Sequence, residues 1–206
     1  MKKTIITMLV LLGLTRFAFA CEETSHWTME AAFGMAHYAN VDANDGQTAV
    51  GRLSMGYANP VLPYGQISVE VGIQSGNSMR LVLPKESIYE LGGIPIDATM
   101  KPMLDILAGF KTEPLADLPF SVWGKGGIAY RSMRLDRESV PGLKGFSPEF
   151  QTGISYAINE KTGINIGYQY ISGNKPELTV NPLTETGILC NMPSAQALLL
   201  GFSYQF

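Results

Sequence analysis

Bulky apolar residues alternate with small or polar residues along most of the chain. From Gln66 to Ile73 the odd positions are Ile, Val, Val and Ile, and the even positions are Gln, Ser, Glu and Gly. The last segment, 197–206, places its bulky side chains mainly at even positions. A period of two is typical of a β-strand with one apolar face. The pattern predicts eight strands, at about 27–39, 48–58, 64–76, 99–111, 120–134, 147–158, 163–173 and 196–206.

The connections between the predicted strands alternate between compact turns and mostly longer loops. The turns are rich in Pro, Asn and other turn formers, at 59–63, 113–119 and 159–162. The other connections lie near 40–47, 77–98, 135–146 and 174–195. This plan predicts an all-β fold, a closed eight-stranded antiparallel up-and-down transmembrane barrel with short periplasmic turns and long external loops. We also expect a short helical turn at 85–91.

The first twenty residues have the features of an export signal. Lys2 and Lys3 precede an apolar run of ten residues, Ile5 to Leu14, and Ala18-Phe19-Ala20 resembles a cleavage site. Ten residues are about half the length of a membrane helix, and no later apolar run is longer. We predict a signal peptide at 1–20 and a single outer-membrane barrel domain at 21–206.

Composition supports a membrane protein over a disordered or nucleic-acid-binding one. Charged residues make up 16% of the chain, compared with roughly 25% in average domains. The formal net charge is −3, which argues against a nucleic-acid partner. Loss of residues 1–20 removes three of the 15 basic residues and no acidic residue, so the net charge of the exported chain falls from −3 to −6.

The two faces of the predicted strands differ in the way a barrel requires. The face opposite the bulky one carries mostly Gly, Ala, Ser and Gln, which suit the narrow lumen of eight strands. Single charges also fall on that face, and we expect Arg52 to pair with Glu70 and Asp105 with Lys125. The predicted lumen charge network comprises Glu30, Arg52, Glu70, Asp105, Lys125, Arg131 and Glu149.

Aromatic residues gather near the ends of the predicted strands, on the bulky face. Two aromatic girdles around an aliphatic band are typical of a barrel that crosses a bilayer. The predicted membrane-interface aromatics at the short-turn ends are Trp27, Tyr57, Phe110, Phe120, Tyr156 and Tyr204.

Two segments resemble the small eight-stranded outer-membrane barrels, most closely the transmembrane domain of the outer-membrane protein A family. The first is Met55-Gly56-Tyr57-Ala58-Asn59-Pro60, which leads into Gln66 to Gly72. The second is the C-terminal end with Phe202, Tyr204 and Phe206, which is similar to the signal that the barrel-assembly machinery recognises in that class. The chain ends at Phe206, without the peptidoglycan-binding domain of longer family members, so the resemblance does not imply a tether to the cell wall.

The resemblance and the loops imply a structural or surface-interaction, adhesin-like role for a monomer in the outer membrane of a Gram-negative bacterium. Expected partners are outer-membrane lipid and lipopolysaccharide, the assembly machinery, and an external protein or surface ligand at loops 77–98 and 174–195. A narrow channel for small hydrophobic solutes remains an alternative, because Leu107, Ile171 and Leu199 also point inward. A lipid A-modifying barrel enzyme is the second alternative.

The sequence contains little material for catalysis, a cofactor or a metal. Its two histidines, His26 and His37, fall at opposite ends of the first predicted strand, so no Ser-His pair is evident. Two histidines and two cysteines without ligand spacing do not make a metal site. We expect neither an enzyme nor a cofactor. We expect Cys21 and Cys190 at opposite ends of the barrel and therefore expect no disulfide between them, and lipidation of Cys21 stays open.

Overall fold

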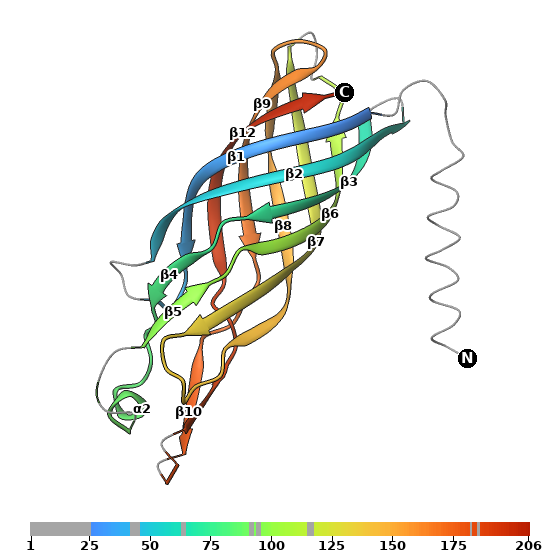
Figure 1. Cartoon of the computed structure of the whole chain (residues 1–206). Helices are drawn as coiled ribbons and strands as arrows, with labels where there is room; N and C mark the ends of the chain where they lie inside the picture. Colours follow the sequence, from blue (N-terminus) through green and yellow to red (C-terminus); the bar gives the residue numbers. More distant parts are fainter. Residues whose placement is uncertain are drawn as a thin grey trace, which may run out of the picture.

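The chain forms a closed β-barrel with oblique strands, and it carries a small cap at one end (Figure 1). The computed structural model describes residues 26–41, 46–62, 65–90, 93, 96–114, 118–181, 183–184 and 186–206. The barrel strands are β1 (His26–Tyr38), β2 (Gln47–Leu62), β3 (Gly65–Gln74), β6 (Met103–Thr112), β7 (Phe120–Leu135), β8 (Leu143–Ala157), β9 (Thr162–Ile171) and β12 (Ala195–Gln205).

The strands pair antiparallel in chain order, and the ring closes between the first and the last. β1 pairs with β12 from Thr28 opposite Gln205 to Tyr38 opposite Ala195. The other side of the ring is continuous from β7 through β8 to β9. The predicted eight-stranded antiparallel barrel is therefore confirmed.

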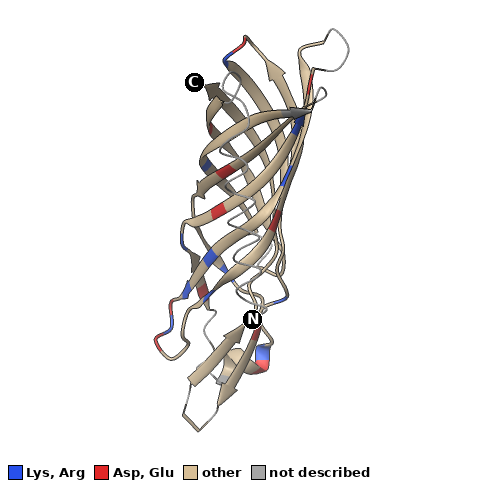
Figure 2. Ribbon diagram, turned by 90° about the vertical axis from the view of Figure 1, so that its right-hand side faces the viewer, with Lys and Arg blue, Asp and Glu red and all other residues tan. Residues whose placement is uncertain are grey.

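Alternation along each strand separates an apolar outside from a mostly polar inside. In β12 the even residues are exposed and most of the odd ones are buried or half-buried. Phe33, Leu53 and Leu198 are more than 60% exposed on the outer face. Such a continuous apolar surface is unfavourable in water but matches a bilayer. Figure 2 shows how few charged positions there are along the wall of the barrel.

Four short strands and one helix extend the structure at the long-loop end. They are β4 (Asn77–Arg80), α2 (Lys85–Glu90), β5 (Asp97–Met100), β10 (Glu177–Asn181) and β11 (Thr186–Cys190). The helix confirms the expected helical turn. The strands correct the expectation of loops without strands, because β4 pairs with β5, β5 pairs with β7, and β10 pairs with β11.

The predicted strands at 64–76 and 99–111 are each divided between the barrel and this extension. β3 ends at Gln74, and β6 begins at Met103, directly after Pro102. Proline has no backbone N–H to donate to a neighbouring strand, which explains the break. At the junction of β3 and β4, a side chain at Gly76 would collide with the carbonyl oxygen of Met100, so the end of β5 can approach this closely only because residue 76 is glycine.

The extension packs on the barrel mouth through buried apolar side chains. Met79, Ile96, Met133, Leu178 and Leu189 belong to one cluster that joins β4, β7 and the β10–β11 hairpin. Ile96 is fully buried. Within the described part of the chain, no helix has the length and hydropathy needed to cross a membrane.

Candidate functional site: the barrel lumen

A layer of ion pairs crosses the lumen of the barrel between β2, β3, β6 and β7. The guanidinium of Arg52 on β2 donates from Nη2 to Glu70 Oε1 at 2.7 Å and to Asp105 Oδ1 at 2.6 Å. Its Nε also donates to Asp105 Oδ2, at 3.1 Å. Lys125 Nζ completes the layer by donating to Glu70 Oε2 at 2.7 Å, with Glu30 Oε2 farther away at 3.7 Å.

Glycine makes room for this layer. Gly72 on β3 faces Asp105 across the strands. A Cβ at Gly72 would lie 2.5 Å from Arg52 Nη2 and 2.6 Å from Asp105 Oδ1. The side chains of Arg52 and Asp105 therefore occupy the space that any other residue at position 72 would need.

The expected pairing of Asp105 with Lys125 is corrected by the strand register. Lys125 lies opposite Gly109, whereas Asp105 lies opposite Ala129, four residues farther along β7 toward the long-loop end. Asp105 therefore pairs with Arg52 from β2, and Lys125 pairs with Glu70 and Glu30. The expected pair of Arg52 with Glu70 is present.

Glu149 and Arg131 lie nearer the long-loop end and make different contacts. Glu149 Oε1 accepts hydrogen bonds from Gln151 Nε2 at 2.6 Å and Gln169 Nε2 at 2.7 Å, and Gln169 also donates to Gln74. Among the described residues, Glu149 Oε2 has no hydrogen-bond partner. A layer of glutamine amides thus separates this carboxyl group from the ion pairs.

Arg131 is held by backbone carbonyls. Its Nη2 donates to the carbonyl of Pro193 at 2.8 Å, and Nη1 to that of Ser172 at 3.5 Å. Both acceptors belong to the segment around the base of the β10–β11 hairpin. Arg131 therefore links the barrel wall to the cap, in addition to carrying a charge in the lumen.

Trp123 also points into the lumen, and the sequence reading missed it. It is 7% exposed, and Lys125 Nζ lies 4.9 Å from its ring centroid. Gly153 and Gly167 leave space for the indole, because a Cβ at Gly167 would lie 2.6 Å from Trp123 Cη2. The alternation could have predicted this orientation, because Trp123 has an odd number like Lys125 and Arg131 and therefore lies on the same face of the strand.

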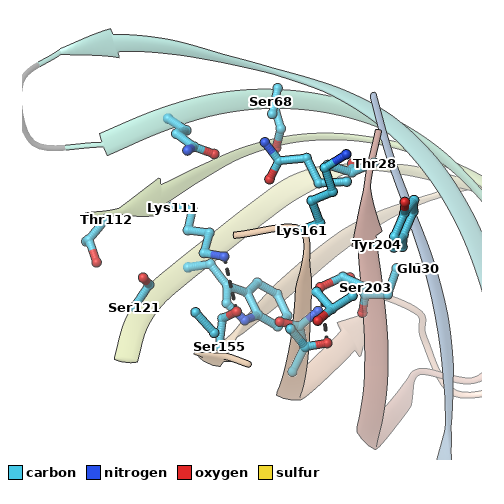
Figure 3. A pocket seen from close by; sticks show the side chains of 18 of the residues that line it. Thr28, Glu30, Ser68, Lys111, Thr112, Ser121, Ser155, Lys161, Ser203 and Tyr204 are labelled. Carbon is cyan, nitrogen blue, oxygen red and sulfur yellow. Dashed lines mark hydrogen bonds between the residues drawn. The ribbon is translucent and has the colours of Figure 1, made fainter. Parts of the chain in front are cut away.

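A cavity of about 290 Å³ lies at the short-turn end of the barrel, next to the ion pairs. Glu70 and Lys125 line it together with residues of the turns, such as Glu113 and Lys161. Figure 3 shows Lys111 and Ser155 on one side of this cavity, with Glu30 and Tyr204 on the other.

The aromatic residues expected at the membrane interface all lie on the outer surface. Trp27 packs edge-on against Tyr57 with centroids 5.4 Å apart, and Phe120 packs against Tyr156 at 5.2 Å. Phe110 is also exposed. The residues of the expected assembly signal are exposed along and just after β12: Phe202, Tyr204 and Phe206.

The residues with potential for other chemistry lie apart. His26 begins β1 near the short turns, and the exposed His37 lies near its other end. The described residues contain no group of three or more His, Cys, Asp or Glu side chains placed to hold a metal. Cys190 is a free, exposed thiol at the end of β11, whereas Cys21 and the expected signal peptide fall outside the described residues.

A closed barrel with an apolar outer face, exposed aromatics near its short-turn end and a charged, packed interior defines a membrane-spanning β-barrel. The family model of the outer membrane protein β-barrel domain matches residues 5–206. The chain belongs to this family, which confirms the resemblance to small outer-membrane barrels and indicates the bacterial outer membrane as its location.

Solved structures show the same fold at low sequence identity. The outer membrane protein OprG from Pseudomonas aeruginosa is 11% identical, with a TM-score of 0.54 over 90% of this chain and 97% of that one. Ail, the attachment invasion locus protein of Yersinia pestis, is 13% identical, with a TM-score of 0.50 over 88% of this chain and 97% of that one. A comparison with curated proteins gave no match.

Proposed function

We propose that this protein is a monomeric surface-interaction barrel whose lumen is plugged and whose external cap binds a partner. The observation that carries the proposal is the cap itself, an ordered extension on the barrel mouth that exposes apolar side chains. Tyr89 on α2 is 74% exposed, Leu183 93% and Ile188 63%. A barrel that served only to span the membrane would not need such a surface.

Burial inside the barrel supports a plugged lumen. Asp105, Leu107 and Gln169 are each 1% exposed, and Glu149 is fully buried. From the cavity to the cap, the lumen is filled first by the ion pairs, then by the glutamine amides and then by the apolar cluster. The similarity to Ail, an attachment invasion locus protein, favours a role at the cell surface over transport.

The binding role is tested with cells that display the protein. We expect them to adhere to an epithelial monolayer more strongly than cells without it, and we expect the triple variant Tyr89→Ser, Leu183→Asp, Ile188→Asp to adhere at the background level. An equally displayed Lys144→Gln variant is the matched control. Adhesion that survives the triple variant, or that is absent from the parent, contradicts the role.

The channel alternative is tested in planar bilayers. A plugged lumen predicts no steady conductance, and a narrow path for small solutes predicts one. Incubation of the refolded protein with lipopolysaccharide tests the enzymatic alternative, because released fatty acid would identify a lipid A-modifying activity. The separation of His26 from His37 along β1 favours a protein without that activity.

Assembly in the membrane is proposed to depend on β12. Its exposed Phe202, Tyr204 and Phe206 would present the C-terminal strand to the barrel-assembly machinery, with outer-membrane lipid and lipopolysaccharide around the finished barrel. Sedimentation of the refolded protein in detergent tests the monomeric state.

A further inference from the structure

The cavity at the short-turn end contains a lysine that the ion-pair layer does not use. Lys111 on β6 lines the cavity, and its Nζ donates to Ser155 Oγ at 3.1 Å. Of the carboxylates in the described residues, none forms an ion pair with it within 4.0 Å. The other inward lysine, Lys125, is already held by Glu70 at 2.7 Å. A half-buried ammonium group with one neutral hydrogen-bond partner can still bind an anion.

Hydrogen-bond donors surround this ammonium group on adjacent strands. Lys111 lies opposite Trp123. Ser121 lies opposite Ser155, which in turn lies opposite Asn165 on β9. All five residues line the cavity. Strand register therefore brings a cation, two hydroxyl groups, an amide and an indole to one wall of the cavity.

Trp123 provides a second observation that points to a ligand. Its Nε1 is buried and has no hydrogen-bond partner among the described residues. An indole N–H can only donate, so it requires an acceptor. A buried donor without an acceptor is costly, by about 1–3 kcal/mol. Trp123 also lines the cavity, so a small movement of its side chain would bring this N–H to an oxygen-bearing ligand held there.

The described acidic residues of the cavity form no ion pair with Lys111 within 4.0 Å, although Glu30 and Glu113 are near enough to attract its charge. Glu70 is held by Arg52 and Lys125. Glu30 on β1 lies on the opposite side of the cavity (Figure 3), and its Oε2 is 3.7 Å from Lys125 Nζ. Glu113 and Glu160 are exposed, where water and salt screen their charge. A volume of about 290 Å³ is at the lower end of the range for small-molecule sites.

We propose that this cavity binds a small oxyanion that enters from the short-turn end, with Lys111 as its cationic anchor and Ser121, Ser155 and Trp123 as donors. The ligand class is a small carboxylate or phosphate. This site is at the other end of the barrel from the external cap, so a failure of the anion-binding proposal would not affect the surface-binding proposal, and the reverse also holds.

Tryptophan fluorescence tests the proposal directly, because Trp27 and Trp123 are the only tryptophans. In a Trp27→Phe background, all tryptophan fluorescence comes from Trp123. Iodide serves as a quenching anion in nanodiscs, where both barrel ends are open to solvent. We expect saturable quenching that acetate, succinate or phosphate relieves, and the most effective of the three identifies the ligand chemistry.

The variant Lys111→Gln should weaken iodide binding at least about tenfold, the effect of losing one charge-assisted hydrogen bond. Lys111→Arg should retain it, and Lys144→Gln, on the exposed far end of β8, should leave it unchanged. Heat-modifiability on gels checks that every variant is folded. Linear quenching in the parent, saturable quenching that oxyanions do not relieve, or no effect of Lys111→Gln in a folded barrel would each overturn the proposal.

Discussion

Arg52 provides the positive charge for two buried carboxylates at once. Its guanidinium reaches Glu70 on the neighbouring strand and Asp105 on the strand beyond, while its side chain is only 2% exposed. A planar group with several fixed donors suits this arrangement better than a lysine would. The stability of the layer therefore depends mainly on Arg52, because this one side chain pairs with both carboxylates.

The substitution Arg52→Met should destabilise the barrel by about 3–5 kcal/mol, because it leaves Glu70 and Asp105 buried with one fewer cation. Urea unfolding in lipid vesicles measures the change. Arg134→Met, at an exposed position of β7, is the matched control and should change stability little. Adding Glu70→Gln and Asp105→Asn to Arg52→Met should recover part of the loss; a similar loss in both arginine variants would contradict the role of the layer.

The substitution Gly167→Ala should also destabilise the barrel, by about 1–3 kcal/mol, because its Cβ would meet the indole of Trp123. Trp123→Leu should relieve the clash, so that the double variant loses less than the sum of the two single variants. Gly145→Ala is the control, since a Cβ there has open space around it. Additive losses in the double-mutant cycle would show that Gly167 and Trp123 do not interact.

At the residue scale, the alternation along the strands placed seven charges on the inward face, and five of them are buried: Arg52, Glu70, Asp105, Arg131 and Glu149. It missed Lys111, which also lines the inside of the barrel. It was not enough to predict every partner. Arg52 and Glu70 flank one turn, so their proximity follows from the local sequence. Asp105 and Arg52 meet over an intervening strand, and that contact depends on register and on the space left by Gly72. Periodicity in one segment does not determine either property.

At the scale of elements, the type of outward-facing residue changes along each strand, as the polarity of the bilayer changes with depth. Ile106 lies at the middle of β6, opposite Val71 on one side and Ile128 on the other. Several exposed aromatic residues, such as Trp27, Phe120 and Tyr204, lie at or near strand ends, whereas Phe33 and Phe150 lie at mid-strand. We therefore expect the aliphatic middle to lie in the hydrocarbon core and the aromatic residues at the strand ends to lie at its boundary.

The substitution Ile106→Lys should cost about 2–4 kcal/mol, whereas Ile158→Lys, just beyond β8, should cost about 0–1 kcal/mol. Both side chains are about half exposed, at 54% and 51%, so depth is the main difference between them. Urea unfolding in vesicles gives both values. Equal costs would show that the middle of β6 is not at the middle of the bilayer.

The barrel strands could be predicted because each spans ten or more residues, which is enough for alternation to stand out. The pattern could not resolve β4 and β5, which have four residues each, or β10 and β11, which have five. A helix period and a strand period are hard to separate over so few residues. Their pairing depends on the cap as a whole, through contacts with β7 and the apolar cluster.

At the scale of the whole molecule, the two ends of the barrel have different surfaces. The short-turn end opens into a polar cavity, and the long-loop end is covered by an apolar cluster with exposed residues above it. We expect this cap to face the outside of the cell, as the long loops of outer-membrane barrels do.

This orientation predicts that a bulky, membrane-impermeant maleimide labels Cys190 on intact cells, because the thiol is free and exposed. The variant Cys190→Ser should lose the label. Lys161→Cys in the Cys190→Ser background, at the β8–β9 turn, should react only after the outer membrane is permeabilised. Labelling of Lys161→Cys on intact cells would reverse the orientation.

The seam between β1 and β12 has a consequence for quality control during synthesis. β12 supplies partners to both β1 and β9, so a chain cut short before residue 195 leaves two facing edges with unpaired backbone donors and acceptors. Such edges cannot be satisfied in hydrocarbon. We therefore expect chains without β12 to be excluded from the finished membrane, because that strand makes the wall continuous.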